Sequence, residues 1–178
     1  RGTGEQPEGS RHMNNQHNSP LTGEYLRAFE RHATKNDPKR GGATVPCWEI
    51  VAYAADILDI AARKLGDNLD MCRLARSLGI DGIVLNKHVD LLKPSKYGAL
   101  VVQNDGGAII VLRETLCREE KRFTLAHEIG HYCLHVQNSG GDYSIFNGAV
   151  IEQEAEIFAA ALMYLLDQRA AQRAAHAA

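Results

Sequence analysis

The pattern His127-Glu128-x-x-His131 combines two imidazoles and a carboxylate at a spacing suited to a metal ion. Residues four apart in a helix lie one above the other on the same face, so His127 and His131 can each direct a ring nitrogen to one tetrahedral zinc ion. Glu128 would project beside the metal, where its carboxylate can take a proton from an activated water molecule. The pattern therefore predicts a zinc hydrolase with Glu128 as the catalytic base.

A third protein ligand is needed, because a catalytic zinc ion usually has three and leaves its fourth position to water. The helix predicted over residues 151–163 offers Glu154, at the edge of its apolar stripe, where a carboxylate is costly unless it meets a cation or a metal. Glu152 and Glu156 turn further toward solvent, in a first turn where the helix dipole favours acidic side chains. Glu154 is therefore the predicted third ligand.

His135 continues the histidine series, but an unbroken helix would place it about 12 Å from His127, too far for both to bind one ion. It can bind only if the helix ends early, and the simpler interpretation is a polar residue that closes the last turn. A single histidine on an apolar helix face is usually a hydrogen-bonded core residue. Two histidines at ligand spacing with a glutamate between them favour a metal site instead.

These two segments resemble the ImmA/IrrE family of zinc metallopeptidases. The family has the motif Arg-Phe-Thr-x-Ala-His-Glu-x-Gly-His, matched by residues 122–131, and then a Glu-Ala-x-x-Phe-Ala-Ala helix, matched by residues 154–160. The resemblance covers residues 47–163 and is strongest at the two helices. The family usually has Asn after Glu-Ala and Pro after Leu-Met, where this chain has Glu156 and Tyr164. These departures concern how the chain leaves the second helix.

The resemblance implies a thermolysin-like site with zinc on His127, His131 and Glu154 and with Glu128 as general base. It also implies the substrate, because members typically cut or inactivate a helix-turn-helix repressor and so release phage, mobile-element or stress genes. An alternative is a metallopeptidase-like module that binds a repressor or antitoxin without cutting it. The intact Glu128 argues against that alternative, because binding alone needs no base. A zinc hydrolase of a non-peptide substrate is a further alternative.

The elements that must position these residues predict an α+β, zincin-like fold. Helices over residues 47–65 and 69–78, each ended by a glycine, precede a small sheet. The sheet comprises a strand at residues 80–85 and a hairpin formed by residues 98–103 and 108–113. The His-Glu helix and the helix with the glutamate ligand follow. In thermolysin-like peptidases the exposed edge of such a sheet receives an extended substrate strand beside the zinc; the sequence leaves open which edge is free.

Composition agrees with a catalytic domain that acts on protein. Hydrophobic residues make up 44% of the chain and the net charge is −2, so nothing indicates a direct nucleic-acid or membrane partner. No apolar run reaches the roughly 18 residues of a transmembrane helix, and no secretory signal is visible. The scattered cysteines indicate a reduced set and a cytoplasmic protein: Cys47, Cys72, Cys117 and Cys133.

The chain divides into three predicted parts. Residues 1–12 look like a leftover of an expression vector that ends before Met13, residues 13–44 are polar and predict a flexible arm, and residues 45–178 form the metallopeptidase domain. A loop after the His-Glu helix is expected to border the cleft. In it, Tyr143 is either a donor to the tetrahedral oxyanion or, as is more common, a surface tyrosine.

Overall fold

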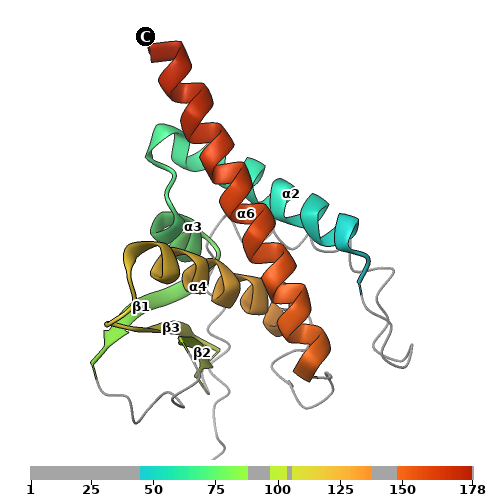
Figure 1. Ribbon diagram of the computed structural model, residues 1–178, viewed down its shortest axis with the longest axis vertical. Helices are drawn as coiled ribbons and strands as arrows, with labels where there is room; N and C mark the ends of the chain where they lie inside the picture. The colour runs from blue at the N-terminus through green and yellow to red at the C-terminus, as the bar shows by residue number, and fades with distance from the viewer. Residues whose placement is uncertain (1–44, 88–96, 104–105, 138–147, 178) are drawn as a thin grey trace, which may run out of the picture.

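The computed structural model describes residues 45–87, 97–103, 106–137 and 148–177. The segment predicted to derive from an expression vector, the predicted arm and Tyr143 lie outside these residues. Within them the fold is α+β, as predicted, and Figure 1 shows α4 lying over the sheet while α6 crosses α4 and α2. The elements are α2 (Cys47–Leu65), the 3-10 turn η2 (Gly66–Asn68), α3 (Met71–Ser77), β1 (Ile80–Asn86), β2 (Gly98–Val102), β3 (Ala108–Arg113), α4 (Arg118–His131), the π-helix η4 (Tyr132–Val136) and α6 (Gly148–Ala177).

The sheet has the order β1-β3-β2, with β1 parallel and β2 antiparallel to β3. The hairpin predicted from the sequence is therefore confirmed as β2 and β3. Burial alternates along β3, with Ala108, Ile110 and Leu112 facing the core, as expected for a strand covered on one face. Because β2 pairs only with β3 among the described strands, its other edge is open within the described chain.

The helices before the sheet also follow the sequence closely. The first predicted helix is α2, which ends at Gly66 as expected, and Gly66 has a positive φ of 56°. The second is α3, which begins after Asp70 because that carboxylate accepts a hydrogen bond from Arg73 N at 2.8 Å. This cap shortens α3 relative to the predicted residues 69–78. None of the described helices is both long and apolar enough to cross a membrane.

The first functional helix, α4, begins with a capping box at Cys117, whose backbone N–H donates to Glu120 Oε2 at 2.8 Å. It does not end at His131 but continues as the π-helix η4. Turns of this kind are rare and occur frequently at functional sites. The extension carries His135 into the interior of the protein, where it is 1% exposed.

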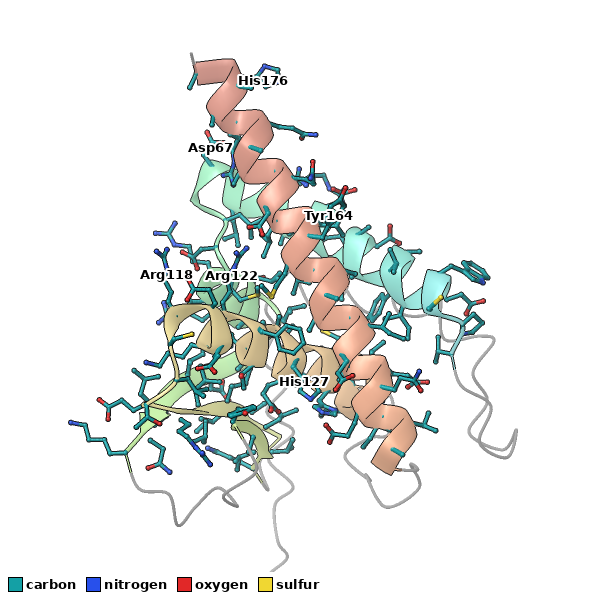
Figure 2. All side chains as sticks on the ribbon, in the orientation of Figure 1. Asp67, Arg118, Arg122, His127, Tyr164 and His176 are labelled. Atoms are coloured by element: carbon teal, nitrogen blue, oxygen red, sulfur yellow. The ribbon has the colours of Figure 1, made fainter. Side chains whose placement is uncertain are left out.

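The second functional helix, α6, is longer than predicted, because it begins at Gly148 and continues past Tyr164 to Ala177. The departure from the family pattern at Tyr164 therefore does not end the helix. Its second half is joined to α2 and the turn after it, since Arg169 Nη1 donates to Asp59 Oδ1 at 2.9 Å and Arg173 Nη1 to Asp67 O at 2.8 Å. Asp67 marks that turn in Figure 2, beside the upper half of α6.

The crossing of α4 and α6 is very close. A Cβ added at Gly130 would lie 3.2 Å from both Cα and O of Ala155 and 3.2 Å from Phe158 Cδ1. Phe158 is fully buried and packs edge-on against Tyr53 of α2, with ring centroids 6.2 Å apart. A glycine at position 130 thus allows the two functional helices to approach, and the aromatic pair fixes them against α2.

Candidate metal centre

His127 and His131 lie one turn apart on α4 and converge as the sequence predicts. Their Nε2 atoms are 3.0 Å apart, and the rings meet edge to face with centroids 4.6 Å apart. Both side chains are largely buried, with 15% and 12% of their surface exposed. Figure 2 shows His127 where α4 crosses the N-terminal part of α6.

The carboxylate that joins them belongs to Glu152, in the N-terminal part of α6. Its Oε2 lies 3.2 Å from His127 Nε2, and its Oε1 lies 3.7 Å from His131 Nε2. One donor atom from each of these three residues lies within 4.8 Å of the others. Among the described residues this is the group of histidine and carboxylate donors that could hold a metal ion.

Glu154, the ligand expected from the sequence, lies outside this group, in which Glu152 is the carboxylate instead. Residues two apart in a helix point in nearly opposite directions, because successive residues are separated by about 100°. Glu154 therefore turns to the buried side, where its Oε1 accepts a hydrogen bond from Val45 N at 2.9 Å. Burial raises the pKa of Glu154, and the Val45 hydrogen bond partly opposes the rise.

The signal for Glu152 lay in helical spacing. One stripe of α6 borders a cleft and carries Glu152, Glu156 and Met163. It lies next to the buried stripe of the same helix, which carries Ala155, Phe158 and Leu162. Lying at the edge of the apolar stripe does not distinguish the two glutamates, because Glu152 and Glu154 flank that stripe on opposite sides. Glu152 is on the side of the cleft, where it is half exposed.

Among the described residues, His135 is not one of the donors that converge. Its Nε2 lies 3.3 Å from the backbone oxygen of Ile151, and its Nδ1 lies 3.9 Å from Glu154 Oε2. It does stand in the last turn, but it is a core residue rather than a surface one. Burial is the main cause that lowers the pKa of His135 to about 4, so the ring is neutral near pH 7.

Glu128 is 6% exposed and lies against the first residue of β2. A Cβ added at Gly98 would lie 3.2 Å from Glu128 Oε1 and 2.6 Å from Thr124 Cγ2. Gly98 therefore leaves room for the carboxylate between α4 and the sheet. The predicted base consequently lies at the junction of the metal-binding helix and the edge strand.

A cleft of about 790 Å³ connects these groups. It runs between β2, α4 and α6. Phe123, one turn before His127, forms part of its apolar lining, and the centroids of the Phe123 and His127 rings are 6.5 Å apart. None of the described residues that line it is Lys or Arg. The lining comprises Tyr97, Gly98, Ala99, Leu100, Glu119, Glu120, Phe123, Thr124, His127, Glu128, His131, Glu152, Glu156 and Met163.

The donor set fits a metal such as zinc. Donors bound tetrahedrally at 2.0–2.1 Å are separated by about 3.3 Å. The two imidazole nitrogens are 3.0 Å apart, and the nearest carboxylate oxygens of Glu152 are 3.2 Å from one nitrogen (Oε2) and 3.7 Å from the other (Oε1). Two imidazoles and one carboxylate are also the ligand types found in hydrolytic zinc sites. Two imidazoles at this distance can also share a hydrogen bond, and it is the third donor, Glu152, that makes the group a candidate metal site.

The site is metallopeptidase-like. Two histidines and a glutamate converge beside a buried carboxylate, and all of them border a cleft along a strand edge. The Peptidase_M78 family model, which describes the IrrE N-terminal-like domain, matches residues 82–176. Because the match covers more than half of the chain, the protein belongs to this family, and the resemblance seen in its two motifs is confirmed. No curated protein and no solved structure matches the chain.

Proposed function

We propose that the protein is a zinc-dependent endopeptidase whose ion is held by His127, His131 and Glu152. The observation that carries this proposal is the convergence of the three donors beside Glu128 in the cleft along β2. Membership of the Peptidase_M78 family supports hydrolysis of a peptide bond rather than of another substrate.

A bound zinc ion would supply the Lewis acidity that polarises the scissile carbonyl and makes water nucleophilic near neutral pH. Glu128 accepts the proton of the attacking water and returns a proton to the leaving nitrogen as the C–N bond breaks. The products are one new carboxylate and one new amine. The burial of Glu128 against Gly98 holds its carboxylate in the cleft, where it can serve both transfers.

The open edge of β2 supports an extended peptide as the substrate. Backbone groups along this edge, which pair with no other described strand, can form main-chain hydrogen bonds with an added strand, which give affinity with little selectivity for side chains. The cleft beside this edge exposes apolar surface at Tyr97, 57% exposed, and Phe123, 39% exposed. Selectivity for one protein then requires contacts outside the cleft.

We propose a helix-turn-helix repressor as that protein, cut in the cytoplasm so that phage, mobile-element or stress genes are expressed. Support for this partner comes from the resemblance to the ImmA/IrrE family. The α2–α3 pair is a candidate for the contacts outside the cleft, because Trp48 and Val51 on α2 are 60% and 43% exposed.

The test is incubation of the zinc-loaded protein with the repressor encoded by the neighbouring gene and, separately, with casein, followed by fragment mapping by mass spectrometry. We expect cleavage of the repressor at one or a few sites, no digestion of casein, and no cleavage by Glu128→Gln. Rapid digestion of casein would instead indicate a general protease. A stable complex in which the repressor stays whole would establish a binding module in place of the peptidase.

A further inference from the structure

The turn of α6 that carries Glu152 has a second contact with the end of α4. His135 Nε2 lies 3.3 Å from the backbone oxygen of Ile151, the residue directly before Glu152. A carbonyl oxygen only accepts, so the ring nitrogen is the donor. His135 is therefore tied to the backbone of the turn from which the candidate ligand extends.

This contact differs from the close packing at the helix crossing. Gly130 and Ala155 bring the backbones of α4 and α6 together where the helices cross, and Phe158 packs against the same glycine. The His135–Ile151 hydrogen bond lies one turn of α6 before Ala155. It therefore adds a polar contact to this packing, nearer to the start of α6.

The π-helix makes the second contact possible. It continues α4 beyond His131 through Tyr132–Val136, and its wider turn changes the direction of His135 relative to an unbroken α-helix. The His135 ring packs beside that of His131, with centroids 5.5 Å apart, while its Nε2 reaches across to α6. The side chain of His135 thus contacts the candidate ligand His131 and the backbone next to the candidate ligand Glu152.

Glu154 supports the same turn from the buried side. Its carboxylate lies 3.9 Å from His135 Nδ1 and accepts the hydrogen bond from Val45 N, just before α2. Glu152 itself is 51% exposed and has little packing of its own. The position of its carboxylate therefore depends on the backbone of this turn, to which His135 is tied through Ile151.

We propose that His135 is a positioning residue for the metal centre: through Ile151 it fixes the first turns of α6 and so holds Glu152 against His127 and His131. This inference rests on the proposed function, since it assumes that the three side chains bind zinc. Partners that orient metal ligands typically change metal affinity by about 10-fold to 100-fold when they are removed.

The test compares two polar substitutions of different reach. In His135→Gln the amide nitrogen can occupy the place of Nε2, whereas in His135→Asn it falls short of Ile151. We expect His135→Asn to weaken zinc binding by about 10-fold or more and His135→Gln to stay within about 3-fold of the unmodified protein. Zinc affinity is measured by competition with a chelator, the ligand-field spectrum of bound Co²⁺ reports coordination geometry, and thermal unfolding of the metal-free proteins shows that each variant is folded.

The same substitution in a Glu152→Ala background shows whether His135 acts through Glu152. If it does, His135→Asn changes the residual zinc affinity of Glu152→Ala by less than about 3-fold, because the ligand that it positions is already gone. An equal loss in both backgrounds, or an equal loss for Asn and Gln, would overturn the positioning role. Normal zinc affinity in His135→Asn, with weakened binding in Glu152→Ala, would overturn this inference alone. Failure of the unmodified protein to bind zinc would overturn the proposed function as well.

Discussion

The two sides of the α4–α6 pair differ in packing and in chemistry. Toward α2 the interface is closely packed, with Gly130 against Ala155 and Phe158 against Tyr53. Toward β2 the same helices separate into a cleft bordered by His127, His131 and several glutamates. The packed side determines where the helices lie, and the cleft side uses that geometry to bring donors together. Substitutions on the packed side should therefore change stability first, and those in the cleft should change chemistry first.

The largest effect is expected in the cleft, from Glu128→Gln. The amide has nearly the same shape and is not a proposed ligand, so fold and zinc content should be kept while the base is lost. The rate of repressor cleavage should fall by about 10²-fold to 10⁴-fold, the usual contribution of general acid–base catalysis. The measurement is initial cleavage rate at equal zinc content. Full activity in this variant would contradict the peptidase mechanism.

The two neighbouring glutamates of α6 provide the sharpest contrast between the sides. Glu152→Ala removes a proposed ligand in the cleft, and we expect its zinc content after dialysis to fall from about one ion per chain to a small fraction. Glu154→Ala should keep the ion but lower the free energy of unfolding by about 1–3 kcal/mol, because Val45 N loses its acceptor.

Metal analysis and urea unfolding of both glutamate variants show which glutamate is needed for the metal and which for stability. Glu156→Ala is the matched control, since Glu156 also borders the cleft but is not among the donors that converge. Loss of the metal from Glu154→Ala, with retention in Glu152→Ala, would restore the ligand expected from the sequence.

The contrast between the two sides also explains which features could be predicted from sequence. Hydrophobic periodicity and glycine stops identified α2 and the strands, because each buries a regular stripe. The convergence of His127 and His131 was predictable because both side chains come from one helix. Which glutamate joins them was not, since that depends on the rotation of α6 about its axis relative to α4. That rotation is determined by Gly130 and Phe158, at long range in the sequence.

A pH effect on stability should come from the buried side. The pKa of His135 is lowered from 6.5 to about 4, so between these values the unfolded chain binds a proton that the folded chain does not. The stability that this neutral histidine contributes is therefore complete above pH 6.5 and is lost as the pH falls toward 4, by up to about 3 kcal/mol. The raised pKa of Glu154 acts in the opposite sense, because protonation of Glu154 on acidification favours the folded state.

Urea unfolding of the metal-free protein between pH 7 and 4, compared with His135→Leu, isolates the histidine. Glu154 is present in both proteins, so the difference between their pH profiles reports His135. We expect the leucine variant to lose less stability over this interval. Identical pH profiles would show that His135 does not titrate in this way.

The smallest effects are expected from two glycines, one on each side. Gly130→Ala gains about 1 kcal/mol of helix propensity, but its Cβ would lie 3.2 Å from the backbone of Ala155. Overpacking against backbone costs about 1–3 kcal/mol, so the net loss in the free energy of unfolding should be about 1 kcal/mol. Gly98→Ala directs its Cβ to within 2.6 Å of Thr124 Cγ2, 3.1 Å of the backbone oxygen of Val111 and 3.2 Å of Glu128 Oε1. Beside some loss of stability, it should therefore lower the cleavage rate by displacing the base. Urea unfolding and cleavage rates of both variants test this division. The opposite result would be a loss of stability without a loss of cleavage rate in Gly98→Ala, and a loss of rate without a loss of stability in Gly130→Ala. It would contradict the division into a packed side that determines stability and a cleft side that determines chemistry.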